Sequence, residues 1–236
     1  MTLRKTTLGF YCLTTALLSA CGTGTAATSG LPPTFDTICL ASPLDRECRV
    51  VASARSQMND LPPIALQVQA GSSEQAGVGG GVVVYQDAGE GWEQLAASFD
   101  GYWYDYPTFA DLEEGVLMHI AGVRPGTGSG NADLAFYALY AEEDAPLHSW
   151  QPVDITSWRD TIGEHLPEGL EIWKGVDFDM GDWTTRWLTA STYLWKAETD
   201  ANCCPTGGRA TIHFALEDNV IKIDHVEYDP TMPDEY

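Results

Sequence analysis

The apolar residues of this chain recur mainly at every second position, which is the spacing of β-strands that bury one face. The clearest case is a pair of alternating runs, 210–216 and 220–226, separated by the polar turn 217–219. The alternating positions are Ile212, Phe214 and Leu216 in the first run and Ile221, Ile223 and His225 in the second. The pattern predicts an antiparallel hairpin that makes His213 and His225 neighbours, as ordinary side chains rather than ligands.

Other runs rich in β-branched and aromatic residues predict further strands. They lie at 64–68, 81–86, 92–99, 115–123, 133–142, 170–176, 185–188 and 192–196. Two stretches, 45–58 and 156–166, have helical spacing instead, with N-caps expected at Asp45 and at Asp154 or Thr156. We therefore expect a mainly β (α+β) fold of antiparallel sheets with two short helices.

The first twenty residues have the composition of an export signal. Arg4 and Lys5 precede an apolar or small-residue stretch, 8–20, which is too short to span a bilayer as a helix. The junction that ends this stretch is Leu18-Ser19-Ala20-Cys21, followed by glycine, and it resembles the lipobox of bacterial lipoproteins. The alternative is an ordinary secretory signal that happens to contain a cysteine.

The lipobox resemblance implies cleavage before Cys21 and lipid on the sulfur and the new α-amine of that residue. Glycine rather than aspartate at position 22 implies sorting to the outer membrane in a Gram-negative envelope. Behind the signal we expect a flexible tether over 21–36, a single mainly antiparallel β domain over 37–228 and a frayed acidic tail over 229–236. The expected location is the bacterial cell envelope, with the lipid-anchored domain facing the periplasm.

The cysteines that remain after Cys12 and Cys21 are accounted for are expected in a compartment that allows disulfides. Four cysteines allow three pairings, and the candidates are Cys39, Cys48, Cys203 and Cys204. We favour a local bond between the first two. For the last two, a bond between neighbours, a metal site and a redox-active pair are alternatives to structural sulfur in a turn.

The net charge narrows the choice of partners. The 236 residues include 12 Lys and Arg against 34 Asp and Glu, so the formal charge is −22. This sign argues against nucleic acid, because phosphate binding needs cationic side chains, and against a basic surface for anionic lipid. Contact with the membrane is therefore expected through the lipid anchor, which holds stably once it carries two or more acyl chains.

Two clusters carry candidate chemistry. Carboxylates of the kind that calcium prefers gather in one short stretch, without EF-hand spacing, at Asp177, Asp179 and Asp182. Aromatic faces, which suit sugar rings, gather in another and are the candidate glycan contacts: Tyr102, Trp103, Tyr104 and Tyr106. A solvated acidic loop and ordinary core packing are the simpler alternatives for the two clusters.

Catalytic signatures such as Gly-x-Ser-x-Gly, His-Glu-x-x-His and the P-loop are absent from the sequence. The segments 166–175 and 200–208 resemble bacterial envelope proteins of uncharacterised activity, and this implies only that the Cys-Cys-Pro-x-Gly-Gly turn is a family feature. We expect a lipid-anchored envelope protein that binds or scaffolds a glycan or protein partner, without catalysis and without a cofactor. The alternatives are an enzyme acting on envelope glycan and a calcium-stabilised adhesion module.

Overall fold

The structure is a computed structural model that describes residues 30–58, 61–73, 77–87, 89, 91–101, 103–124, 130–140, 148–179 and 188–231. These residues form antiparallel sheets, and their helices are two short 3-10 helices, η1 (Ser157–Asp160) and η2 (Ile162–Glu164). The mainly β, antiparallel fold expected from the sequence is thus confirmed. Among the described residues, no helix has the length and apolarity needed to cross a bilayer.

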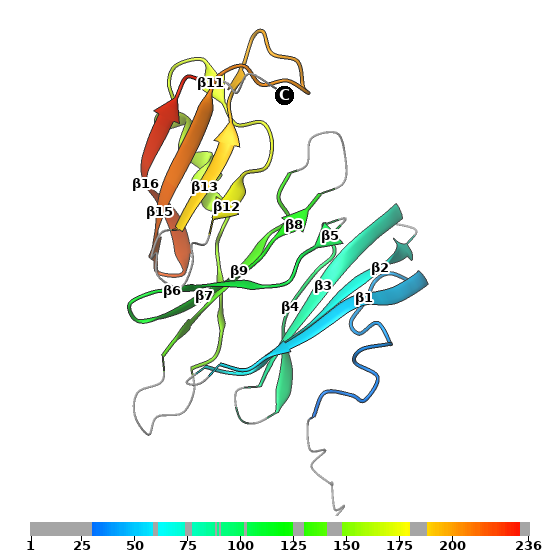
Figure 1. Ribbon diagram of the computed structural model, residues 1–236. Coiled ribbons are helices and arrows are strands. Elements are labelled where there is room, and N and C mark those ends of the chain that lie inside the picture. Colours follow the sequence, from blue (N-terminus) through cyan, green and yellow to red (C-terminus); the bar gives the residue numbers. More distant parts are fainter. Residues whose placement is uncertain are drawn as a thin grey trace, which may run out of the picture.

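Three four-stranded sheets and two short strand pairs build the fold (Figure 1). The N-terminal sheet has the order β1 (Arg46–Ser56), β2 (Ile64–Ser73), β3 (Gly77–Asp87) and β4 (Trp92–Ser98). The middle sheet has the order β10 (Gln151–Val153), β9 (Leu134–Leu139), β7 (Gly115–Ile120) and β6 (Thr108–Asp111). The C-terminal sheet has the order β12 (Asp177–Asp179), β13 (Leu188–Tyr193), β15 (Arg209–Glu217) and β16 (Val220–Asp229). The short pairs are β5 (Trp103–Tyr104) with β8 (Gly122–Val123) and β11 (Leu170–Glu171) with β14 (Trp195–Lys196).

The middle sheet lies between the other two and is buried on both faces (Figure 1). All six residues of β7 are buried, and Val116, Met118 and Ile120 belong to the core shared with the N-terminal sheet. Leu117 belongs instead to the core shared with the C-terminal sheet. Because alternate residues of one strand pack into two different cores, this strand has a continuously apolar sequence.

A segment before β1 covers the outer face of the N-terminal sheet. Phe35 is fully buried and contacts Tyr85, with 6.0 Å between the ring centroids. The carboxylate of Asp36 pairs with the guanidinium of Arg55 in β1 at 3.1 Å. The tether predicted over 21–36 is therefore too long at its C-terminal end, because its last two residues pack against the sheet.

Two buried glutamines of β2 hold this segment in place. The Nε2 of Gln67 donates to the carbonyls of Phe35 and Ile38, and its Oε1 accepts from the Leu40 N–H at 2.9 Å. The Nε2 of Gln69 donates to the Leu40 carbonyl at 2.8 Å. Buried amides cost free energy unless they are hydrogen-bonded. These bonds satisfy the two amides and also give backbone groups of the segment partners that a neighbouring strand would otherwise supply.

The stretch 45–58, predicted as a helix, forms strand β1 instead. Ala52 and Ala54 pack against the core of the N-terminal sheet. Cys48 and Val50 are half-buried and lie opposite Gln69 and its neighbours, on the face that the N-terminal segment covers. The strand wins because it contacts neighbours on both faces, whereas a helix would bury only one stripe of its side chains.

The second predicted helix, 156–166, is present only as the turns η1 and η2, which bury Trp158 and Ile162 in the core of the C-terminal sheet. Of the two candidate caps, Thr156 holds the N-cap position but its side chain makes no capping hydrogen bond. The carboxylate of Asp154 accepts from the N–H groups of Thr156 and Ser157 instead, at 2.9 and 3.0 Å. The strand expected over 170–176 is reduced to β11. Most of the strand expected over 185–188 lies outside the described residues, β13 runs through 189–191 where no strand was expected, and the stretch 192–196 is divided between the end of β13 and β14. The two turns lie against a face of the C-terminal sheet, where the Trp158 ring contacts Phe214 of β15 with 5.3 Å between the centroids.

The C-terminal hairpin is confirmed as β15 and β16. Its turn residues Asp218 and Asn219 have positive φ angles of 52° and 59°, as the tight turns preferred by β-hairpins require. The pairing places His213 opposite His225, as the sequence predicted. A register shift follows His213, so the alternation of the two strands is interrupted beside the histidine pair.

Candidate functional site

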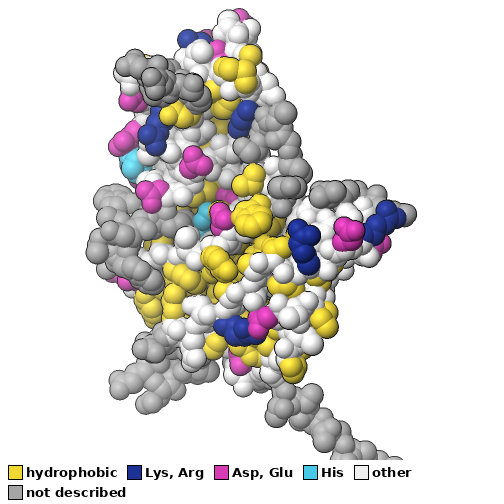
Figure 2. Space-filling model, turned by 45° about the vertical axis from the view of Figure 1, so that its right-hand side comes forward, with side chains coloured by type: hydrophobic (Ala, Val, Ile, Leu, Met, Phe, Trp, Pro, Cys, Tyr) yellow, Lys and Arg dark blue, Asp and Glu magenta, His cyan; other side chains and the backbone are white. Residues whose placement is uncertain are grey.

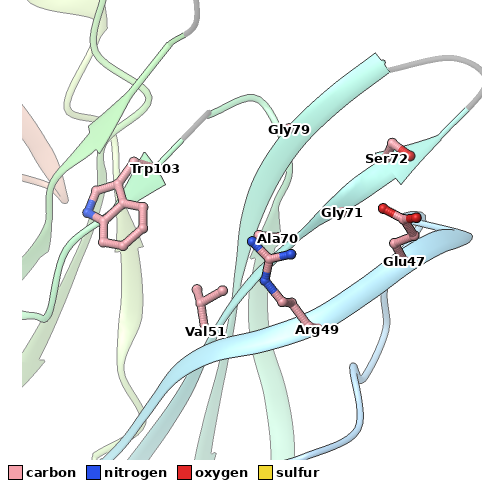
Figure 3. Close-up of a pocket in the computed structure, with 8 residues that line it drawn as sticks. All are labelled: Glu47, Arg49, Val51, Ala70, Gly71, Ser72, Gly79 and Trp103. Atoms are coloured by element: carbon pink, nitrogen blue, oxygen red, sulfur yellow. The ribbon is translucent and has the colours of Figure 1, made fainter.

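A hollow lies at one end of the N-terminal sheet, beside the exposed side chain of Trp103 (Figure 3). We call this hollow and its lining the Trp103 surface. Its cavity volume is about 210 Å³. Strands β1 to β3 form its floor, and Trp103 of β5 stands across from Arg49 and Val51 of β1. The lining consists of Glu47, Arg49, Val51, Ala70, Gly71, Ser72, Gly79 and Trp103.

Irregular pairing in β1 places the charged residues of this surface. The register with β2 shifts twice, at 46–49 and at 50–52. A one-residue shift reverses which face of a strand the subsequent side chains occupy. Arg49 pairs with Ala70, and its side chain lies on the face of β1 that packs against the core farther along that strand. Without the shift at 50–52, the Arg49 side chain would lie on the opposite face of β1.

The indole of Trp103 is half exposed, and its position is fixed by its neighbours. Its Nε1–H donates to Asp105 Oδ1 at 2.9 Å. The next residue, Tyr104, points into the core, where its hydroxyl accepts from the Gly101 N–H at 3.0 Å and bonds to the Ser98 hydroxyl at 2.7 Å. Because Tyr104 anchors the strand from below, the Trp103 ring is presented to solvent on a fixed support.

The structure divides the predicted glycan contacts. Trp103 lines the hollow, whereas Tyr106 is 58% exposed and is not part of the lining. Tyr104 is only 1% exposed, so its predicted contact with glycan is wrong: strand alternation turns it into the core, where burial raises the pKa of its hydroxyl. Tyr102 lies outside the described residues.

The Trp103 surface has the groups needed to hold a polar ligand with one apolar face. An aromatic ring packs against apolar C–H groups, while Arg49 and Glu47 offer donors and acceptors for hydroxyl groups. Among the described residues of the lining, Glu47 supplies the one carboxylate, whereas glycoside hydrolysis uses a pair.

Shifted carboxyl groups lie in turns and on surface strands rather than in this hollow. Hydrogen bonds from Ser53 and Arg55 lower the pKa of Asp36, and backbone hydrogen bonds lower the pKa of Asp154. The hydroxyl and N–H of Thr231 likewise lower the pKa of Asp229. A general acid in glycoside hydrolysis needs the opposite shift, so these three carboxylates stabilise local structure instead.

The acidic side chains are also dispersed over the molecule. On the face drawn in Figure 2 they stand singly, while hydrophobic side chains gather in the lower half, over the N-terminal and middle sheets. Asp177 and Asp179 point away from the core on β12, because Phe178 between them packs into it. Asp182 lies outside the described residues, so the three-carboxylate calcium cluster stays a prediction.

A second hollow, with a volume of about 240 Å³, lies where β8 meets the C-terminal sheet. Trp195 borders it and stacks on Trp173, with ring centroids 6.2 Å apart and planes 11° apart. The ammonium of Lys174 lies 5.6 Å from the Trp195 ring. Trp173 covers one face of the buried Trp195 ring, so Trp195 contributes mainly to packing.

Both candidate pairs of cysteines are bonded locally. Cys39 is joined to Cys48, the pairing that the sequence favoured, and this bond ties the N-terminal segment to β1. Cys203 is joined to its neighbour Cys204, one of the alternatives left open, in an exposed loop before β15. Cys21, the predicted lipid attachment site, lies outside the described residues.

Sequence reasoning missed the charged residues of the Trp103 surface. Arg49 and Glu47 precede Trp103 by more than fifty positions and lie in a stretch that was predicted as a helix. Exposed and half-buried residues alternate there in the structure, but Val50 and Val51 are adjacent apolar residues in the sequence, so the sequence pattern does not identify a strand. The bulges that turn them toward Trp103 have no signature in the sequence either.

Comparisons with known proteins add little to this geometry. No protein-family model matches the chain, and no curated protein matches it. A solved structure, xylan beta-1,4-xylosidase from Bacillus halodurans C-125, aligns at 8% identity with a TM-score of 0.27, covering 75% of this chain and 31% of the xylosidase chain. The chain thus spans less than a third of that enzyme's length, and a similarity this weak supports neither a shared fold nor a shared activity.

Proposed function

We propose that this protein is a lipid-anchored bacterial envelope protein whose β domain binds glycan at the Trp103 surface. The observation that supports the anchor is the run Leu18-Ser19-Ala20-Cys21 behind a short apolar signal. The acylated cysteine anchors the protein to a membrane, and Gly22 in place of aspartate favours the outer membrane, with the domain on the periplasmic side. Several acyl chains on one residue hold an acidic protein at a membrane without any basic patch.

The binding role is supported by the Trp103 surface. Its aromatic ring stands on a fixed strand, and Arg49 and Glu47 lie across the hollow from it. This combination matches a sugar, which has apolar C–H faces and a rim of hydroxyl groups. Glycan is also the abundant polymer that a protein in this location would meet.

The anchor is tested by labelling cells with an alkyne fatty acid and isolating the full chain. The wild-type chain should take up label and Cys21→Ser should not, while Cys12→Ser, a matched change inside the signal, should remain labelled. Label retained on the Cys21→Ser chain, or absent from the wild type, would contradict lipidation.

Glycan binding is tested by sedimenting the protein with isolated peptidoglycan sacculi. Removing a central aromatic anchor costs more than 1 kcal/mol in typical interfaces, so Trp103→Ala should weaken binding about tenfold. Tyr106→Ala is the matched control, because that ring is exposed and outside the lining. Equal binding by Trp103→Ala and wild type, or no sedimentation of the wild type, would refute the glycan assignment while leaving the anchor standing.

A further inference from the structure

The outer face of the C-terminal sheet carries two histidines and a glutamate beside one another. His213 of β15 lies directly opposite His225 of the edge strand β16. Glu227 follows two residues later on β16, so its side chain shares the outward face with His225. Ile212 and Val226, the neighbours of the histidines in the chain, point the other way and pack in the core.

The three side chains are close enough to hold one ion. Glu227 Oε1 lies 3.6 Å from His213 Nε2 and 3.9 Å from His225 Nε2, and one ligand atom from each residue lies within 4.8 Å of the other two. Two donors bound to a tetrahedral zinc ion at about 2.0–2.1 Å lie about 3.4 Å apart. Movements of well under 2 Å at side-chain tips would therefore bring all three atoms onto an ion.

His213 is the residue whose environment most needs a ligand. Its side chain is only 19% exposed, and neither of its ring nitrogens has a hydrogen-bond partner among the described residues. Buried polar atoms are nearly always bonded, so the ring nitrogens of His213 are candidates to bind an ion. An ion bound at Nε2 would satisfy the nitrogen that faces Glu227.

His225 is already oriented in the way that metal-binding histidines are. Its Nδ1 lies 2.9 Å from the carboxylate of Asp224, which accepts the proton on that nitrogen. This bond leaves the lone pair on Nε2, the nitrogen nearer to Glu227. A carboxylate behind a histidine also raises the basicity of the ligand nitrogen.

We propose that His213, His225 and Glu227 form a binding site for a divalent transition-metal ion, most simply Zn²⁺. Two imidazoles and one carboxylate are a donor set for such ions, whereas calcium takes oxygen donors. The two rings are now stacked, with centroids 4.0 Å apart and planes at 9°, so their lone pairs lie in parallel planes. Binding needs only a tilt of the exposed His225 ring that keeps its Nδ1 bonded to Asp224, and water completes the coordination. This site is separate from the Trp103 surface and does not depend on the proposed function.

Titration of the purified full chain with zinc chloride, followed by calorimetry without reductant, tests the site. We expect one saturable site, weakened at least tenfold in His225→Ala and in Glu227→Gln, whose side chains are exposed and whose loss leaves the fold intact. Asp224→Asn should weaken binding about tenfold, the size typical of outer-shell partners. His165→Ala, a change of an exposed histidine in the turn after η2, should bind as the wild type does.

Histidine ring signals in NMR spectra give a second measurement that needs no variant. Zinc should shift the ring protons of His213 and His225 and leave those of His165 in place. Absence of a saturable site, unchanged affinity in both His225→Ala and Glu227→Gln, or shifts confined to other histidines would each overturn the proposal.

Discussion

The shared middle sheet leads to a prediction about how the molecule unfolds. Leu117 is fully buried in the core with the C-terminal sheet, and Met118, the next residue, is fully buried in the core with the N-terminal sheet. Leu117→Ala removes three buried carbons, worth about 2.4 kcal/mol in transfer free energy, and leaves a cavity. The expected loss is about 2–5 kcal/mol, and Met118→Ala falls in the same range.

The two substitutions act on different cores but on one strand, so both should lower a single unfolding transition. When one face of the middle sheet loses its packing, the strands are no longer held in place, and the side chains on the other face then lose their packing as well. The expected loss is a large share of a total stability that is about 5–15 kcal/mol for ordinary domains. Independent lobes would behave differently, because each substitution would then lower only the transition of its own core.

Urea unfolding followed by tryptophan fluorescence and far-UV circular dichroism makes this measurable. Buried tryptophans report on both cores, Trp150 on the first and Trp158 on the second. Leu139→Ala is the matched control: it is the same change in the same sheet at a position that is 40% exposed, and it should cost less than about 0.5 kcal/mol. Two separated transitions, with Leu117→Ala moving one and Met118→Ala the other, would refute a shared cooperative unit.

Two further predictions concern the edges of the fold. Replacing Cys39 and Cys48 by serine opens a loop with a sequence separation of 9, so chain entropy predicts a loss of about 2.5 kcal/mol in urea unfolding; an unchanged midpoint would mean that Gln67 and its partners hold the segment alone. Asp154→Ala should cost about 1 kcal/mol at pH 7, measured by thermal unfolding, because its carboxylate accepts from two backbone N–H groups. Since the folded pKa of Asp154 lies below the ordinary 3.8, its contribution is complete above that pH and disappears as the pH falls through the folded pKa; a gap between variant and wild type that stays constant down to pH 2 would contradict this assignment.

Local patterns in the sequence predicted those elements whose two faces differ. The C-terminal hairpin has one apolar face and a turn of residues that tolerate positive φ, so its signals agree except at the register shift, where Val226 rather than His225 faces the core. Strand β1 has contacts on both faces and two register shifts, so its alternation is broken and its spacing also fits a helix. The sequence of β7 does not indicate the three-sheet arrangement either. A strand buried on both faces is apolar throughout and shows no alternation of apolar and polar residues.

The histidine cluster and the Trp103 surface also differ in how far the sequence could predict them. Hairpin pairing brings His213 and His225 near one another, which the sequence could predict, but the register shift between His213 and Phe214 is what places them directly opposite. Glu227 completes the cluster only because the register of β16 places it on the same face. The Trp103 surface depends on contacts between distant segments: Arg49 reaches it through bulges that no local pattern encodes. Single exposed residues are predictable, whereas their assembly into a surface depends on long-range pairing.

The packed N-terminal segment fixes the end of the domain to which the proposed anchor would be attached. Chain geometry limits the separation of Cys21 and Gly30 to about 32 Å, because nine residues span at most about 3.6 Å each. The segment that follows is bound to β2 by Gln67 and to β1 by a disulfide, so any pull along the tether is carried into the N-terminal sheet. The C-terminal sheet lies at the opposite end of the molecule from this segment (Figure 1). On a membrane-anchored chain, the tether would therefore attach at the end of the molecule opposite the histidine cluster and would leave that cluster uncovered.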